Sequence, residues 1–166
     1  MAKTRIFLGS SAAAKSQAKA LIAALSSEEV EFLPWWDAFT PGHTLLAGLD
    51  ALRDSVQGAI LLFSPESEGI VRGNPVQLPS MNVLFEFGYF YGHFEKNKVA
   101  IMKYGDFYLP TDLGGYLHIP GSKFFKRGAV SKISKQTMNE FNKWIVSSGL
   151  VAEESQTKPK YQLLFA

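Results

Sequence analysis

The sequence predicts an α/β fold, a flavodoxin-like three-layer sandwich around a central five-stranded parallel sheet in the strand order 2-1-3-4-5. Three observations carry this prediction. Short apolar runs alternate along the chain with segments of helical periodicity, which is typical of βαβ units. The run Gly58-Ala59-Ile60-Leu61-Leu62-Phe63 is continuously apolar, as strands buried on both faces are. Residues 82–94 are apolar nearly all round, so a helix there must be buried on most sides.

The N-terminal half supplies two strands and two helices. Residues 5–9 are a short apolar run ending in Gly-Ser-Ser, which indicates a buried strand followed by a turn. Residues 12–25 are rich in Ala, Lys and Leu at helical spacing and predict a helix. Residues 30–35 predict a second strand, in which Pro34 favours an edge position. After a Thr-Pro-Gly break, residues 44–56 predict an amphipathic helix.

The C-terminal half continues the alternation. The strand at 58–63 is followed by a predicted loop at 64–80, and loops of that length are usually functional or mobile. The helix at 82–94 comes next. Two short strands and a closing amphipathic helix complete the domain, at 99–102, 116–119 and 132–146. In such a sheet the ligand crevice lies beyond the carboxyl ends of the strands, at the switch point between the first and third.

Composition excludes several kinds of function. The chain has 166 residues, a formal charge of +2 and no cysteine, which predicts one globular domain without disulfides or thiolate chemistry. His43, His93 and His118 lie at no metal-ligand spacing, so we expect no metal site, and the near charge balance argues against nucleic-acid binding. No apolar stretch reaches signal-peptide or membrane-span length, which predicts a soluble, cytoplasmic protein with no membrane partner.

The segment 151–166 is predicted to be a linker. Residues 153–160 are polar and contain Lys-Pro-Lys, and residues 161–165 turn apolar again. One interpretation is that a further, C-terminal domain starts here, after the domain at residues 1–150. The alternative is a tail that packs back on that domain.

Glu86 is the candidate catalytic residue. Its neighbours on the predicted helix are aromatic or apolar on nearly every side, and burying an ionised carboxylate without partners costs several kcal/mol. The structural alternative is a glutamate that faces a polar gap or forms an ion pair with an arginine such as Arg5, Arg53 or Arg72. The functional hypothesis is a carboxylate whose surroundings raise its pKa or aim it at a substrate.

A lone carboxylate without metal or cysteine suits the cleavage of a glycosidic bond. The transition state is oxocarbenium-like, and a carboxylate beside the anomeric carbon stabilises its positive charge or forms a covalent intermediate. Nicotinamide leaves NAD as a neutral molecule, so a second carboxylic acid is not required. Asp37 and Glu66 are conceivable second carboxylates.

Three further segments are candidate substrate contacts. Gly9-Ser10-Ser11 follows the first strand, where backbone N–H groups and hydroxyls can hold a phosphate or make an ordinary helix cap. One tryptophan of Trp35-Trp36-Asp37 can stack on a base or nicotinamide, or pack in the core. Arg72, in the long predicted loop, can bind a phosphate or be a solvated loop arginine.

These segments resemble the bacterial TIR domains of cyclic-nucleotide-activated antiphage effectors, which are fused to STING or used in Pycsar systems. The resemblance runs from about residue 5 to about residue 121 through IFLGSS, WWDAFTPG, AILLFSPES, RGN and above all NVLFEFGYFYG. It implies a TIR-like fold and hydrolysis of NAD⁺, as a substrate rather than a cofactor, to nicotinamide and ADP-ribose. The resemblance gives the catalytic role to Glu86 and puts these residues in or near the nucleotide site: Gly9, Ser10, Ser11, Trp36, Asp37, Phe63, Ser64 and Asn82.

The resemblance also implies control by assembly. In the family, a sensor domain binds a cyclic dinucleotide and stacks, so that TIR domains self-associate and a neighbour completes the site. The linker-like tail favours the STING-fused type, with the sensor outside this sequence, and we then expect low activity from this chain alone. Two positions depart from the family pattern: Ser80-Met81 stands where an Arg-Asp pair is common, and Gln57 where an acidic residue is common.

Two other functions stay open. A nucleoside deoxyribosyltransferase shares the layout and uses a Glu at a helix start to form a covalent sugar intermediate. A non-catalytic TIR-type or receiver-like interaction module is the second alternative. A receiver would need acidic residues where this chain has Gly-Ser-Ser and Ser64, and an adaptor would not need a buried carboxylate.

Overall fold

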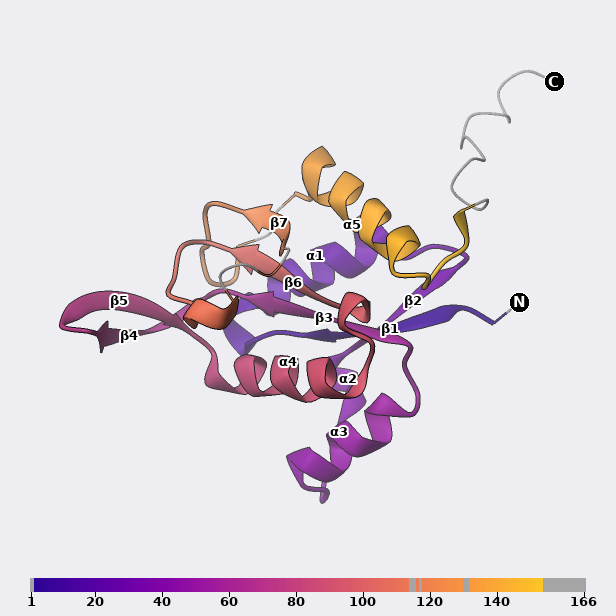
Figure 1. Cartoon of the computed structure of the whole chain (residues 1–166), viewed down its shortest axis with the longest axis horizontal. Helices are drawn as coiled ribbons and strands as arrows, with labels where there is room; N and C mark the ends of the chain where they lie inside the picture. Colours follow the sequence, from indigo (N-terminus) through magenta and orange to yellow (C-terminus); the bar gives the residue numbers. More distant parts are fainter. Residues whose placement is uncertain (1, 114–115, 117, 130–131, 154–166) are drawn as a thin grey trace.

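The computed structural model describes residues 2–113, 116, 118–129 and 132–153. In this part of the chain a five-stranded parallel sheet runs in the order β2-β1-β3-β6-β7, which confirms the predicted fold class and strand order (Figure 1). Its strands are β1 (Thr4–Gly9), β2 (Val30–Pro34), β3 (Gly58–Phe63), β6 (Val99–Tyr104) and β7 (His118–Ser122). Most of the predicted linker, residues 154–166, lies outside the described residues.

The register of the sheet fixes where the strand ends meet. Gly9, the last residue of β1, lies opposite Leu61 of β3, and on the other side Leu8 lies opposite Pro34 of β2. The carboxyl ends of β1 and β3 are therefore side by side, at the switch point predicted for ligand binding. β2 is an edge strand, which is where Pro34, lacking an N–H, is tolerated.

The helices follow the predicted pattern with shifted boundaries: α1 (Lys15–Leu25), α2 (Trp35–Ala38), α3 (Leu45–Arg53), α4 (Met81–His93) and α5 (Lys135–Ser147). Thr44, Ser80 and Ser134 cap α3, α4 and α5 by accepting a hydrogen bond from the backbone N–H three residues on. The predicted helix at 12–25 is divided, because a 3-10 turn at Ala12–Ala14 precedes α1. The predicted strand at 30–35 ends at Pro34, since Trp35 already begins α2.

The last two elements lie further along the chain than predicted. β7 occupies His118–Ser122 rather than 116–119, and α5 starts at Lys135 rather than 132. Thr137 is buried in the first turn of α5 and its hydroxyl donates to the carbonyl of Pro120 at 2.6 Å. This bond holds the start of α5 on β7, which sets both boundaries.

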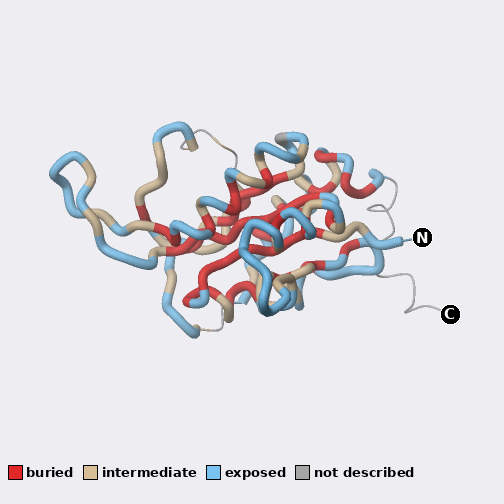
Figure 2. The backbone as a smooth tube through the Cα atoms, turned by 90° about the horizontal axis from the view of Figure 1, so that it is seen from below, coloured by how far each residue is buried: buried red, intermediate tan, exposed pale blue. Residues whose placement is uncertain are grey.

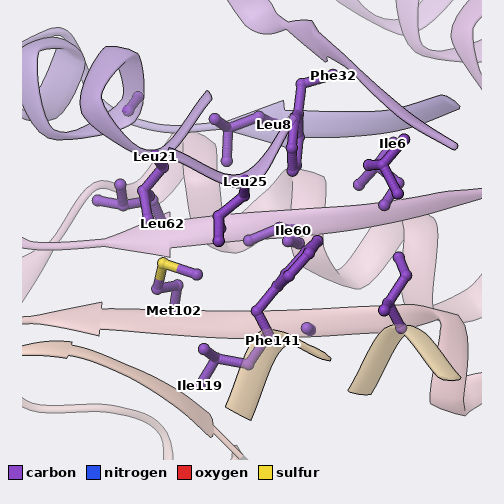
Figure 3. Packing of buried hydrophobic residues seen from close by; sticks show 14 of the residues in the cluster. Ile6, Leu8, Leu21, Leu25, Phe32, Ile60, Leu62, Met102, Ile119 and Phe141 are labelled. Atoms are coloured by element: carbon purple, nitrogen blue, oxygen red, sulfur yellow. The ribbon is translucent and has the colours of Figure 1, made fainter. Parts of the chain in front are cut away.

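Alternating side chains of the strands divide the core into two layers. Ile6, Leu8, Ile60 and Leu62 point to the face covered by α1 and α5, where Figure 3 shows them with Leu21, Leu25 and Phe141. Phe7, Leu61 and Phe63 point to the opposite face, under α3 and α4. Figure 1 shows these two helix layers on either side of the sheet, and Figure 2 shows the buried residues concentrated in its central strands.

The segment 64–80 is not a loop, and this prediction was wrong. It forms an antiparallel hairpin of β4 (Pro65–Val71) and β5 (Asn74–Pro79), which projects from the body of the molecule (Figure 1). Arg72 and Gly73 both adopt positive φ angles, 50° and 80°, as a tight two-residue hairpin turn requires. The three prolines suggested a loop, but a two-stranded sheet has only edge strands, where proline is tolerated.

Candidate active site

Glu86 lies in the second turn of α4 and its side chain reaches the carboxyl end of β1. A β-carbon built on Gly9 would stand 2.7 Å from Glu86 Oε2 and 2.6 Å from Leu61 Cδ1. The carboxylate therefore rests on the backbone of Gly9, in space that any other residue at position 9 would fill. Ser80 fixes the start of the helix, because its Oγ accepts from the N–H of Val83 at 3.4 Å.

The carboxylate of Glu86 is buried without a partner. The residue is 6% exposed, and Oε2 accepts no hydrogen bond within the described part of the chain. Burial therefore raises the pKa of Glu86 from 4.5 to about 7, with no nearby charge contributing to the shift. At neutral pH the group is poised between its protonated and ionised forms, and a carboxyl shifted in this way is a candidate functional group.

The arginines that might have paired with Glu86 lie elsewhere. Arg5 pairs with Glu31 at 3.6 Å, and Arg53 pairs with Asp50 and Asp54, each at 3.7 Å. Arg72 is exposed at the turn of the β4–β5 hairpin. The fold therefore contains no ion pair between Glu86 and any of these three arginines.

The serines after β1 connect the neighbouring strand ends. Trp35 Nε1 donates to Ser10 Oγ at 2.9 Å, and the hydroxyls of Ser11 and Ser64 lie 3.5 Å apart. Ser11 precedes the 3-10 turn, yet its side chain makes no capping hydrogen bond. The Gly-Ser-Ser segment is thus more than a helix cap, since its hydroxyls join β1 to the ends of β2 and β3.

Lys15 is a member of this cluster that the sequence prediction missed. Its ammonium lies 5.0 Å from the ring centroid of Trp36 and 5.8 Å from that of Trp35, within cation–π range. The described residues place no carboxylate in an ion pair with it. The only sequence signal was position: a lysine at the first residue of the helix that follows Gly-Ser-Ser.

The other predicted site residues fall into three groups. Asp37 on α2 and Asn82 in the first turn of α4 are exposed near the strand ends. Phe63 is fully buried and packs against Phe87 and Phe107, so its ring belongs to the core although Ser64 follows it directly. The fold does not bring Arg72 to this cluster.

This cluster coincides neither with a metal cluster of the described residues nor with the cavity near β7. No group of three His, Cys, Asp or Glu side chains in the described ranges is placed to hold a metal ion. A cavity of about 510 Å³ lies at the other edge of the sheet, lined by residues of β6, β7 and α5 such as His118, Glu140 and Trp144. None of the predicted site residues lines it. No helix of the described chain is long and apolar enough to cross a membrane.

The arrangement at the ends of β1 and β3 suits a nucleotide. The ammonium of Lys15 and the backbone after β1 can contact phosphates, an indole ring can stack on a base, and the carboxylate of Glu86 lies against Gly9. The hydroxyls of Ser10 and Ser11 are buried and already have partners in the fold, so they would have to exchange these to contact a ligand. The sequence profile described as the TIR domain of the CAP12/Pycsar effector protein matches residues 5–123.

Two curated relatives carry the name CD-NTase-associated protein 12. The protein of Sphingobacterium faecium is 35% identical over 116 residues, which are 68% of this chain and 35% of that protein. The protein of Lachnospiraceae bacterium (strain RUG226) is 29% identical over 145 residues, 81% of this chain and 46% of that protein. The chain therefore spans a third to a half of the length of these relatives.

Proposed function

Because this chain belongs to the family of CAP12/Pycsar effector TIR domains, an antiphage effector family, we propose that it hydrolyses NAD⁺ to nicotinamide and ADP-ribose. The observation that carries the proposal is the carboxylate of Glu86, buried without a partner against Gly9 at the switch point of the sheet. The described residues give this buried carboxylate no partner, and a cationic substrate would supply one.

In the proposed reaction the bond between ribose C1′ and the pyridinium nitrogen breaks. Its electron pair leaves with nicotinamide, which becomes neutral and needs no proton. The ionised carboxylate of Glu86 stabilises the positive charge that develops on the ribose. Water then adds to C1′, and the proton it loses is accepted by Glu86, whose pKa of about 7 suits that transfer, and is released to solvent.

The rest of the cluster would hold the substrate. We assign Lys15, Ser10 and Ser11 to the phosphates and ribose, because they offer a cation and hydroxyls beside the backbone after β1. Trp36 would stack on the nicotinamide or adenine ring, with Asp37 and Asn82 as exposed polar contacts nearby. The hydroxyl of Ser64 would steady Ser11.

We further propose that activity is switched on by assembly in response to a cyclic nucleotide. Support comes from the family and from the relatives' names, which associate them with a CD-NTase. The chain covers less than half of those relatives, so the part that senses the signal would lie outside these 166 residues. The chain alone should then turn over slowly when dilute and faster when crowded or artificially oligomerised.

The test is incubation with NAD⁺ at high protein concentration, with the products separated by chromatography. We expect nicotinamide and ADP-ribose from the wild type and none from Glu86→Gln, provided that circular dichroism shows the variant folded. Undiminished NAD⁺ loss in the folded variant would refute the role of Glu86. Transfer of a deoxyribose between free bases, without NAD⁺ cleavage, would instead favour the deoxyribosyltransferase alternative.

A further inference from the structure

The β4–β5 hairpin carries an exposed groove that the proposed chemistry does not use. The register places Ile70 opposite Pro75 and Glu68 opposite Gln77, so these four side chains share one face of the hairpin. With the intervening Gly69 and Val76 they line a hollow of about 620 Å³. Ile70 is 76% exposed, an unusual state for a large apolar side chain in a projecting strand.

Glu68 is the one charged residue that lines this hairpin groove, and the exposed cation of the same hairpin, Arg72, lies at its turn. Glu68 lies at the rim of the groove and Glu66 lies nearby on the same strand, both exposed. Neither carboxylate takes part in an ion pair with another described residue. The groove thus has an apolar floor and an acidic rim, which fits a protruding apolar side chain flanked by cations.

This chain carries such a side chain in the Phe124 loop, which we define as residues 123–127. Phe124 is 85% exposed, more than any other large apolar side chain of the described residues. Exposed cations flank it on both sides, Lys123, Lys126 and Arg127, and none of them forms an ion pair in the described part of the chain.

The Phe124 loop is held rigidly. Gln17 of α1 is fully buried and its Nε2 donates to the carbonyl of Lys126 at 2.9 Å. Phe125 packs against the core, so the neighbouring Phe124 is directed outward. A loop fixed in this way loses little conformational entropy when Phe124 enters a pocket, which favours binding.

The base of the hairpin and the Phe124 loop meet at Gly105. A β-carbon on Gly105 would lie 3.0 Å from Phe125 Cβ and 3.0 Å from Pro65 Cδ, so the base of the hairpin and the Phe124 loop both pack against Gly105. In a dimer related by a two-fold axis, each hairpin would receive the partner's loop and both contacts would form at once.

We propose that the occupant of the hairpin groove is Phe124 of a second copy of this chain, with Glu68 facing the cations of the Phe124 loop. The proposal names a surface for the self-association in the proposed function and rests on that part of it, but not on NAD⁺ cleavage. It accounts together for the exposed apolar residue of the hairpin, the exposed aromatic residue of the loop and their opposite charges.

Analytical ultracentrifugation of the whole chain, without NAD⁺ and from micromolar to millimolar concentration, tests the proposal. We expect reversible self-association of the wild type that Ile70→Asp and Phe124→Asp each weaken about tenfold or more, as the loss of a central apolar contact does. Met138→Asp, at an exposed methionine of α5, is the matched control and should associate like the wild type.

Charge reversal identifies the pairing. Glu68→Lys should weaken association, and combining it with Lys126→Glu should restore it. A folded wild type that stays monomeric at millimolar concentration, unimpaired association of both Asp variants, or no rescue by the double reversal would overturn the proposal. Glu86→Gln should associate like the wild type, so undiminished NAD⁺ loss in that variant, with association intact, would count against the proposed function alone.

Discussion

The carboxylate of Glu86 and the backbone of Gly9 are in direct contact across 77 residues of sequence, and the missing side chain of Gly9 is what makes room for it. The contact joins the end of β1 to α4 at the switch point of the parallel sheet. It positions the one partnerless buried carboxylate of the described chain.

Gly9→Ala should impair catalysis by displacing Glu86. The new methyl group would meet Glu86 Oε2 at 2.7 Å and Leu61 Cδ1 at 2.6 Å, and such overpacking costs about 1–3 kcal/mol of stability. We expect kcat to fall about tenfold or more, because a small misplacement of a catalytic group is costly. The control is Gly88→Ala on α4, the helix that carries Glu86, where a β-carbon would meet nothing within 4 Å. Equal kcat in the two variants would contradict the role assigned to this contact.

Glu86→Gln should stabilise the fold in a pH-dependent way. The pKa of Glu86 is raised by burial from 4.5 to about 7, so the folded state resists ionisation that the unfolded state allows. Wild-type stability should therefore fall as pH rises from 4.5 to about 7 and level off above, while that of the variant should not. The advantage of the variant should grow by about 3 kcal/mol across this window. Urea unfolding at several pH values measures it, and parallel curves would disprove the shift.

The value of kcat/KM for NAD⁺ should rise with pH and reach a plateau above about pH 7, because the carboxylate of Glu86 must be ionised to stabilise the cationic transition state. The kcat/KM profile reports the free enzyme, in which the raised pKa applies. Initial rates at low NAD⁺ concentration across the range, in buffers of constant ionic strength, give this profile. A midpoint near the ordinary pKa of a glutamate would show that burial does not control the group.

Lys15→Met should raise KM for NAD⁺ by about tenfold, as the loss of a charge-assisted contact to a phosphate does. Arg72→Met removes a cation from the hairpin turn and should leave KM unchanged, since Arg72 is remote from the cluster at the ends of β1 and β3. Steady-state kinetics of both variants at one ionic strength make the comparison. A larger increase in KM for Arg72→Met than for Lys15→Met would assign the phosphate contact to Arg72 instead.

Sequence pattern predicted most of the fold because burial dictates it. β3 is continuously apolar and β1 is apolar from Ile6 to Leu8, since both faces of the sheet are covered there, and the amphipathic segments became the covering helices. The hairpin at 65–79 escaped prediction because its prolines and glycine resemble those of a loop. Those residues are compatible with β-structure because the two strands pair only with each other and each keeps an open edge.

The candidate site was partly predictable for a similar reason. Glu86 stood out because a charged residue among apolar neighbours is conspicuous in any sequence, and the structure bears out its burial. Lys15 was missed because a lysine at the start of a helix is ordinary, and only the fold brings it over Trp36. The family resemblance placed Phe63 near the site, yet strand alternation turns its ring into the core.

The hydrogen bond from Gln17 to the carbonyl of Lys126 has a mechanical consequence. Gln17 stands two residues after Lys15 in the first turn of α1, so this turn carries a lysine over the tryptophans and also holds the Phe124 loop. A displacement of the Phe124 loop is therefore transmitted to this helical turn. Association of two copies through the Phe124 loop would thus shift the first turn of α1 and with it Lys15, at the cluster by the ends of β1 and β3.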